Sequence, residues 1–132
     1  PLQSGSSRVL KAMNRHYDRE TYLAAVDYLR EKVPEIALST DIIVGFPTET
    51  EEDFNTTMEF VQKVGFTDIH PFPFSSRSGT VASKIKDLSK EVKKQRLDKL
   101  LEVKKQLKQD FINQRYYQRH NKLYSYQDVH LW

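Results

Sequence analysis

The sequence predicts an α/β protein in which two parallel strands alternate with about four helices, and this unit is expected to be half of a larger barrel. β-Branched and apolar residues indicate a buried strand over 36–45 and a second strand over 66–74. Helical apolar periodicity lies before, between and after these strands, an order typical of parallel strands joined by right-handed crossovers. Because two strands do not complete a sheet under four helices, we expect the rest of the barrel to lie elsewhere.

The helices before the first strand have clear start signals. Ser6 or Ser7 can cap a short helix that runs to about Arg15, and Asp18 can cap a second helix over 19–33. Pro34 then ends the second helix. The second helix carries an i, i+3, i+4, i+7 apolar stripe: Tyr22, Ala25, Val26, Leu29 and Val33.

Alternation along the strand 36–45 separates two faces. One face is mainly apolar and should meet the outer helices, whereas the other is small and polar and should line the barrel interior. The first face holds Leu38, Thr40, Ile42 and Val44, and the second holds Ala37, Ser39, Asp41 and Ile43. A carboxylate inside a strand is costly unless it faces a polar cavity or a partner, so Asp41 is a candidate site residue. It can equally be satisfied by neighbouring polar groups.

The middle of the chain predicts a capped helix and an edge strand. Thr50 and Asp53 resemble a capping box for a helix over 51–64, and Gly65 fits its C-terminal left-handed position. In the strand 66–74, Pro71 and Pro73 cannot donate ladder hydrogen bonds, so this strand should lie at a sheet edge. His70, on the same strand, is more often a packed histidine than a ligand.

A long helix over about 90–116 closes the predicted α/β unit, which covers 1–116. Its apolar seam consists of Leu97, Leu100, Leu101, Leu107 and Phe111. The tail 117–132 has no clear period, and we expect it to be irregular. The segment 84–122 carries 13 Lys/Arg against 5 Asp/Glu, which indicates either a solvated helix face or a surface that meets phosphates or an acidic partner.

Composition excludes several classes of site. The chain has 132 residues, about one domain, and no cysteine, so by itself it cannot hold a cysteine-ligated metal or cluster. Its four histidines lack metal-ligand spacing, and no metal ligand is predicted. No apolar run approaches the roughly 18–20 residues that span a bilayer. We therefore expect a cytoplasmic protein with no membrane partner, and the start at Pro1 looks like the middle of something longer.

Two loops have the chemistry of binding segments. The stretch Gln3-Ser4-Gly5-Ser6 would follow a preceding strand, and its amide and hydroxyls suit either a polar ligand or an ordinary turn with a helix cap. Arg77, in a loop rich in serine and glycine, can pair with a phosphate or carboxylate, although exposed loop arginines are equally common. No phosphate-binding loop, nucleophile elbow or dinucleotide fingerprint is present.

Several motifs in order resemble the second half of the catalytic domain of radical S-adenosylmethionine methylthiotransferases, over about residues 1–114. The motifs are Pro1-Leu2-Gln3-Ser4-Gly5-Ser6, Val9-Leu10-Lys11-Ala12-Met13-Asn14-Arg15, Thr40-Asp41-Ile42-Ile43-Val44-Gly45-Phe46-Pro47 and Glu49-Thr50-Glu51-Glu52-Asp53-Phe54. The stretch 69–80 is most similar to the branch that acts on threonylcarbamoyladenosine in tRNA.

The resemblance implies a (β/α)6 partial TIM-type barrel and an enzyme that adds a methylthio group to a modified adenosine of tRNA. It implies S-adenosylmethionine and two [4Fe-4S] clusters as cofactors, one of them held by a CxxxCxxC loop. These cysteines are absent from this chain, so we expect no catalytic residue here and no activity of the chain alone. The family's small RNA-binding β-domain is also not visible in the tail.

The resemblance also implies cofactor-binding residues. It assigns Gln3, Ser4 and Gly5 to a loop near the polar end of the cofactor. It places Asp41, Ile43 and Gly45 along the adenosine, and Arg77 in a loop that faces substrate or cofactor. Asp41 stands where radical enzymes commonly have glycine, and Thr48 replaces a glycine of the family turn.

Two alternatives remain open. One is a non-enzymatic RNA- or protein-binding α/β module that uses the basic C-terminal helix, and the other is a different radical S-adenosylmethionine Fe-S oxidoreductase. With an open sheet edge and half of a barrel interior exposed, the chain on its own is expected to self-associate.

Overall fold

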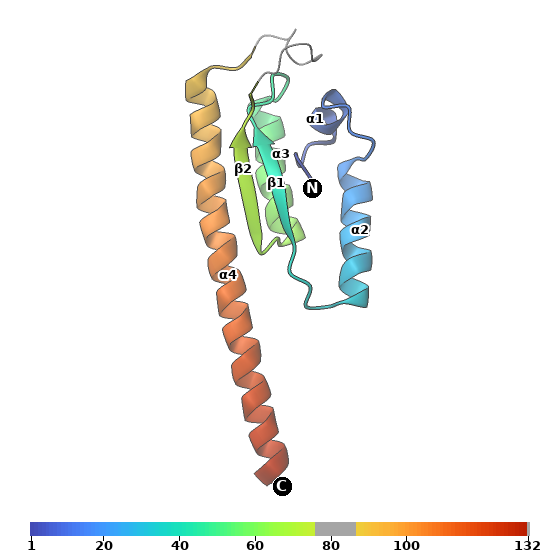
Figure 1. Ribbon diagram of the computed structural model, residues 1–132, viewed down its shortest axis with the longest axis vertical. Helices are drawn as coiled ribbons and strands as arrows, with labels where there is room; N and C mark the ends of the chain where they lie inside the picture. The colour runs from blue at the N-terminus through green and yellow to red at the C-terminus, as the bar shows by residue number, and fades with distance from the viewer. Residues whose placement is uncertain (76–86, 132) are drawn as a thin grey trace.

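The computed structural model describes the backbone of residues 1–75 and 87–131 and the side chains of 1–75 and 87–116. Within these ranges, four helices and two strands follow one another along the chain (Figure 1). Their bounds are α1 (Ser7–Ala12), α2 (Arg19–Lys32), β1 (Ser39–Val44), α3 (Glu51–Val64), β2 (Asp68–Pro73) and α4 (Lys90–Leu131). The predicted α/β class, with two strands and about four helices, is confirmed for this part of the chain.

The two strands form a parallel sheet whose register pairs Asp41 with His70 and Ile43 with Phe72. The segment before α1 adds one further bridge on the other side of β1. There the Gln3 N–H donates to the Asp41 carbonyl at 2.9 Å, and the Gln3 carbonyl accepts from the Ile43 N–H at 2.9 Å. Gln3 therefore lies beside β1 as a third, minimal strand.

The core lies on one face of the sheet. Thr40, Ile42 and Val44 of β1 are buried, as the alternation predicted. In Figure 1, α3 covers this face from behind, α4 runs beside β2, and no helix crosses the front of the sheet. The buried apolar cluster contains Leu2, Val26, Ile42, Val44, Phe54, Phe60, Val61, Val64, Phe66, Ile69, Leu100 and Leu107.

The free edge of β2 is covered by lysines from α4. In the described part of the chain β2 pairs only with β1, which confirms the predicted edge position. Lys104 Nζ donates to the Ile69 carbonyl at 2.9 Å, and Lys93 Nζ donates to the Phe74 carbonyl at 3.0 Å. These side chains satisfy carbonyls that a further strand would otherwise use.

The predicted caps are present. The side chains of Ser6 and Asp18 accept from the N–H groups of Val9 and Thr21 at the starts of α1 and α2. Thr50 and Asp53 form a reciprocal capping box at the start of α3, and α3 ends at Gly65, whose φ of 73° is left-handed. One boundary differs: α1 ends at Ala12 rather than near Arg15, and Asn14 follows at a φ of 60°.

Two predictions about the last helix are wrong. The helix does not end near residue 116, because α4 continues to Leu131, so the segment 117–131 is helical rather than irregular. That segment contains no glycine or proline, so nothing in it breaks the helical backbone even without an apolar period. Leu101, assigned to the apolar seam, is 43 % exposed. Of the helices in the described ranges, none has both the length and the apolar character to span a membrane.

Candidate functional site

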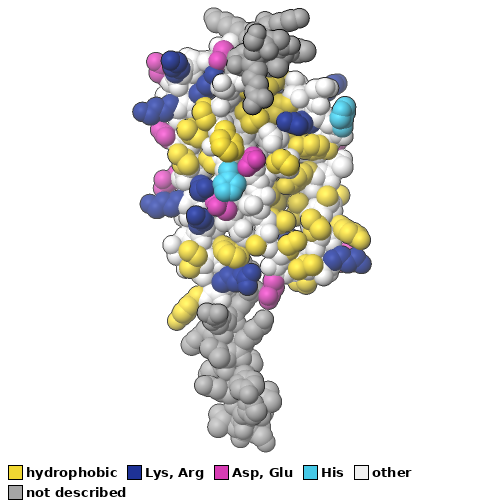
Figure 2. Space-filling view, in the orientation of Figure 1, with side chains coloured by type: hydrophobic (Ala, Val, Ile, Leu, Met, Phe, Trp, Pro, Cys, Tyr) yellow, Lys and Arg dark blue, Asp and Glu magenta, His cyan; other side chains and the backbone are white. Residues whose placement is uncertain are grey.

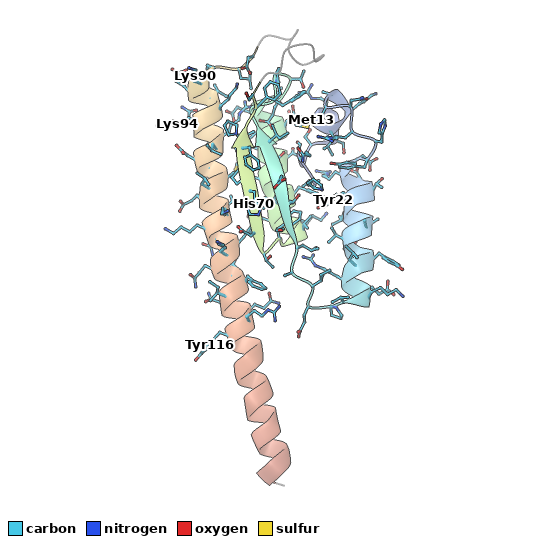
Figure 3. All side chains as sticks on the ribbon, viewed as in Figure 1. Met13, Tyr22, His70, Lys90, Lys94 and Tyr116 are labelled. Atoms are coloured by element: carbon cyan, nitrogen blue, oxygen red, sulfur yellow. The ribbon has the colours of Figure 1, made fainter. Side chains whose placement is uncertain are left out.

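The candidate site is the face of the sheet that no helix covers. Strand alternation and register place two rows of side chains on it, Asp41 beside His70 and Ile43 beside Phe72. His70 is exposed at the centre of this face (Figure 3), and Phe72 is 51 % exposed. In the space-filling view of the same side, hydrophobic surface lies over the sheet and basic side chains follow the side of α4 (Figure 2). Together with Ser39 and Asp68 at the start of the strands, the face therefore combines two carboxylates, a hydroxyl, an imidazole and two apolar groups.

Gln3 belongs to the same region because its backbone is bonded to both Asp41 and Ile43. Its φ of 72° is uncommon for a residue other than glycine. The two bonds to β1 fix the residue in this conformation, and its side chain is half-buried. Three of the predicted cofactor residues, Gln3, Asp41 and Ile43, are thus neighbours at one place.

Ser4 and Gly5 are buried against α3 instead. Thr57 Oγ1 lies 3.2 Å from Ser4 Oγ and accepts from the Gly5 N–H at 3.0 Å. A Cβ on Gly5 would lie 2.7 Å from Thr57 Cα and 2.9 Å from Phe60 Cβ. A glycine at this position therefore lets the loop approach α3 closely, which holds the neighbouring Gln3 against β1.

Gly45 ends β1 in a turn that packs on α4. Its φ is 75°, its N–H donates to Glu49 Oε1 at 2.9 Å, and an added Cβ would lie 2.6 Å from Lys93 Cγ. The position therefore requires glycine both for its backbone conformation and for the close contact with the helix. Arg77, the last of the predicted cofactor residues, lies outside the described residues.

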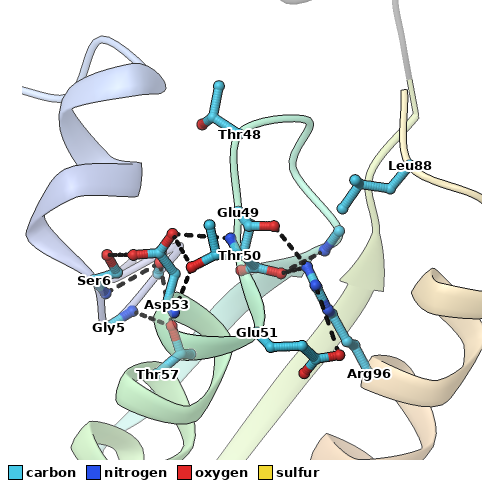
Figure 4. Close-up of polar contacts among 12 residues, drawn as sticks. Gly5, Ser6, Thr48, Glu49, Thr50, Glu51, Asp53, Thr57, Leu88 and Arg96 are labelled. Atoms are coloured by element: carbon cyan, nitrogen blue, oxygen red, sulfur yellow. Dashed lines mark hydrogen bonds and ion pairs between the residues drawn. The ribbon is translucent and has the colours of Figure 1, made fainter. Parts of the chain in front are cut away.

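Glu49 and Arg96 form a buried ion pair that connects this turn to α4 (Figure 4). Arg96 donates through Nη1 to Glu49 Oε1 at 2.8 Å and to the Glu49 carbonyl at 3.0 Å. The two side chains are 0 % and 5 % exposed. Burial raises the pKa of Glu49 above its ordinary value, while the Gly45 N–H and the Arg96 charge oppose this rise. Among the described residues, Glu49 Oε2 and Arg96 Nε have no hydrogen-bond partner.

Asp53 forms a second polar cluster that joins α1 to α3. Its carboxylate accepts from Ser6 Oγ at 2.9 Å, from the Thr50 N–H at 2.9 Å and from the Thr50 hydroxyl at 2.9 Å. Arg8 also donates to it from α1. Burial alone would raise the pKa of Asp53, but these donors outweigh it and hold the pKa below its ordinary range.

The sequence analysis assigned no role to Glu49, Arg96 or Thr57. A signal for Arg96 was available, because it lies four residues before Leu100 and eleven before Leu107, on the apolar seam of α4. A cation on such a seam requires a buried partner. Within the described ranges, no three His, Cys, Asp or Glu side chains gather in a way that could hold a metal ion.

Comparison with known proteins relates the first part of the chain to one superfamily. Residues 1–61, from the first loop through β1 and most of α3, match the family model of the radical SAM superfamily. The open face of β1 and the loop that carries Gln3 lie within the matched stretch.

The individual relatives that the chain resembles have a more specific name than the superfamily. The chain is 49 % identical over 118 residues to the tRNA-2-methylthio-N(6)-dimethylallyladenosine synthase of Pseudothermotoga lettingae, a match that covers 88 % of this chain and 27 % of the relative. Proteins of the same name from Acetivibrio thermocellus and Fusobacterium nucleatum are 48 % identical over 111 residues and 53 % identical over 104 residues. Those matches cover 83 % and 78 % of this chain, and 23 % and 24 % of the relatives.

The chain thus spans about a quarter of the length of the curated relatives that it matches. The superfamily match supports the radical SAM part of the predicted resemblance. The names of the relatives support the tRNA methylthiotransferase part. The finer prediction, the threonylcarbamoyladenosine branch, stays a prediction.

Proposed function

We propose that this chain forms one wall of the active centre of a radical SAM tRNA methylthiotransferase, and that the uncovered face of β1 and β2 is turned toward cofactor and substrate. The observation that carries the proposal is the contrast between the two faces of the sheet. One face is covered by the buried apolar core, and the other presents Asp41, Ile43, His70 and Phe72 with no helix over it. The match to the superfamily model and the relatives' names support the assignment.

The side chains on this face suit a nucleoside such as the adenosine of S-adenosylmethionine. A carboxylate accepts hydrogen bonds from ribose hydroxyls, which fits Asp41, and the flat base can pack on Ile43. When bound beside its cluster, S-adenosylmethionine supplies a radical that removes hydrogen from the substrate. The residues described here bind and orient, and none is proposed as catalytic. With no cysteine in the chain, the ligands of the [4Fe-4S] clusters must come from outside it.

We assign two roles within the predicted cofactor set. Gln3, Asp41 and Ile43 are proposed as direct contacts, because all three are only half-buried, Asp41 and Ile43 on the uncovered face of β1 and Gln3 beside that strand. Ser4, Gly5 and Gly45 are proposed to hold the two loops in place through α3 and α4. Arg77 stays a proposed contact to a carboxylate or phosphate of substrate or cofactor.

The substrate is proposed to be an adenosine of tRNA already modified at N6. The relatives' names support the dimethylallyl form. The sequence of 69–80 favours the threonylcarbamoyl form, which is kept as the alternative. Mass spectrometry of nucleosides from tRNA, in cells with and without the gene, separates the two by which methylthio nucleoside is lost.

Whether the uncovered face contacts the cofactor is tested with Asp41→Asn in the full-length protein that carries this chain. We expect a higher KM for S-adenosylmethionine in methylthio transfer to tRNA, because a neutral amide is a weaker acceptor than a carboxylate. Asp27→Asn, on the exposed side of α2, is the matched control and should leave KM unchanged. An unchanged KM for Asp41→Asn contradicts the cofactor contact, and a full-length protein that makes no methylthio nucleoside contradicts the proposed activity.

We also keep two proposals about the chain by itself: that it has no methylthiotransferase activity, and that it self-associates. The exposed ring of Phe72 and the half-buried side chain of Ile43 on the uncovered face support association. Sedimentation velocity of the isolated chain tests it, and a single monomeric species across the concentration range contradicts it.

A further inference from the structure

One face of α4 carries a row of lysines that no part of the fold described so far uses. We call Lys90, Lys94, Lys105 and Lys108 the basic stripe. At about 100° of rotation per residue they fall within about 60° of the helix circumference. All four are exposed. From Lys90 to Lys108 they span 19 residues of helix, or about 27 Å between the first and the last.

Most lysines of the basic stripe are not engaged in ion pairs within the described part of the chain. Among the described side chains, Lys90, Lys94 and Lys105 have no ion pair, and Lys108 only approaches Asp68, at 3.9 Å. The acidic residues on this part of the helix lie outside the stripe's arc: Glu91, Asp98, Glu102 and Asp110. Exposed lysines without carboxylate partners can neutralise the charges of an anionic partner without first losing a contact.

The stripe borders the uncovered face of the sheet. Lys104 Nζ lies 3.3 Å from Asp68 Oδ1, and Asp68 shares the strand face of His70 and Phe72. Lys108 reaches the same carboxylate from the stripe itself. Figure 3 shows Lys90 and Lys94 at the start of α4, with His70 on the strand beside this helix. A ligand lying on the sheet would therefore have the stripe along one side.

Exposed rings and apolar groups accompany the charges. Phe72 is 51 % exposed on the sheet, and Leu101 and Ile112, which fall within the arc of the stripe, are also exposed. An acidic protein would use the lysines but not the ring. RNA presents closely spaced phosphates together with flat bases that stack on aromatic side chains. This combination favours RNA as the partner.

We propose that the basic stripe holds the phosphate backbone of the tRNA substrate and that Phe72 stacks on one of its bases beside the active-site wall. The inference rests on the proposed function, because tRNA is the substrate proposed above. The inference adds the surface to which the tRNA would bind. Phosphate contacts position a nucleic acid without reading its sequence, so the stripe would fix how the tRNA lies rather than which base is modified.

The test compares two triple variants of the full-length protein with equal change of charge. The stripe variant is Lys90→Gln, Lys94→Gln and Lys105→Gln, and the control is Lys11→Gln, Lys63→Gln and Lys99→Gln, all exposed and off the stripe. Binding of a fluorescent tRNA transcript is measured at several salt concentrations without cofactor. We expect the stripe variant to bind about tenfold more weakly or worse, with a log–log salt slope shallower by about 2 to 3, and the control to bind like the parent.

A second pair of variants tests the stacking. Phe72→Ala should weaken binding about tenfold with an unchanged salt slope, because an aromatic contact carries no charge. Phe72→Leu keeps an apolar side chain without the ring and should weaken binding comparably. Equal affinity of the stripe variant and its control overturns the inference, as does a stripe variant that loses affinity for polyglutamate while it keeps affinity for tRNA.

The outcomes separate this inference from the proposed function. Loss of tRNA affinity in the stripe variant of a protein that makes no methylthio nucleoside upholds the RNA surface and refutes the activity. Normal methylthio transfer with an unchanged KM for tRNA in the stripe variant upholds the activity and refutes the surface.

Discussion

Glu49 and Asp53 are four residues apart, both are nearly buried, and each faces an arginine, yet their pKa values move in opposite directions. Asp53 accepts from two hydroxyls and a backbone N–H as well as from Arg8, which itself stays open to solvent. Glu49 has the Gly45 N–H and an arginine as deeply buried as itself, and one of its oxygens has no partner. The deeper burial of Glu49, together with the larger number of donors around Asp53, decides which carboxylate is stabilised as the anion, since each faces an arginine.

The two carboxylates also hold different parts of the molecule. Asp53 ties α1 to the start of α3 and so fixes the loop that carries Gln3. Glu49 ties the turn after β1 to α4 and so fixes the end of the strand that carries Asp41 and Ile43. One cluster is a well-satisfied network and the other a buried pair whose desolvation cost is only partly offset.

The largest effect is expected from breaking the buried pair. Arg96→Met leaves the Glu49 carboxylate buried with only the Gly45 N–H, and we expect a loss of about 3–5 kcal/mol in the free energy of unfolding. Urea unfolding followed by circular dichroism measures it. The double variant Glu49→Leu with Arg96→Met should recover most of the loss, because it removes both charges. A double variant as unstable as the single one contradicts an electrostatic origin.

A smaller effect is expected at Asp53. Asp53→Asn removes the charge opposite Arg8 and turns an amide toward donors that need an acceptor, Ser6 Oγ and Thr50 N–H among them. We expect a loss of about 1–3 kcal/mol by the same unfolding measurement. Glu52→Gln, the exposed neighbour with the same change of charge, should change stability far less. Equal losses in the two variants would show that the network around Asp53 contributes nothing of its own.

The smallest effects, on the order of 1 kcal/mol, are the changes with pH in the stability that Asp53 and Glu49 contribute, and these changes have opposite signs. The folded pKa of Asp53 is lowered from 3.8, so its stabilisation is present above that value and is lost as pH falls through the folded pKa. The advantage of the parent over Asp53→Asn should therefore shrink in acid. The pKa of Glu49 is raised from 4.5, so its favourable contribution is present below that value and is lost as pH rises through the folded pKa. The stability of the parent relative to Glu49→Gln should therefore increase as the solution is acidified. If the stability differences of the two variants from the parent changed with pH in the same direction, the comparison would be contradicted.

Local features of the fold followed from the sequence because their causes are local. The capping box of Thr50 and Asp53, the left-handed Gly65 and the edge position imposed by Pro71 and Pro73 each depend on a few adjacent residues. The faces of β1 followed from its alternation. The end of α4 did not, because a helix without breakers continues whether or not its face is apolar.

The candidate site was predictable only in part, since its supports are long-range. Gln3 lies beside Asp41 and Ile43, a proximity that the sequence did not predict. The contact of Gly5 with Thr57 spans 52 residues, and that of Glu49 with Arg96 spans 47. The place of Arg96 on the apolar seam of α4 indicates a buried cation, but only the packed structure shows that its partner is Glu49. Pairings of this kind depend on tertiary packing that no local pattern specifies.

The lysines along β2 also set a limit on assembly. Lys104 bonds the Ile69 carbonyl of β2, Lys93 bonds the Phe74 carbonyl just after it, and two residues of β2 are prolines without N–H groups. On the other side of the sheet, Gln3 already bonds the backbone of β1. A second copy could therefore extend the sheet only by displacing Gln3 or a lysine, so self-association is expected to cover the open face of the sheet rather than to lengthen it strand by strand.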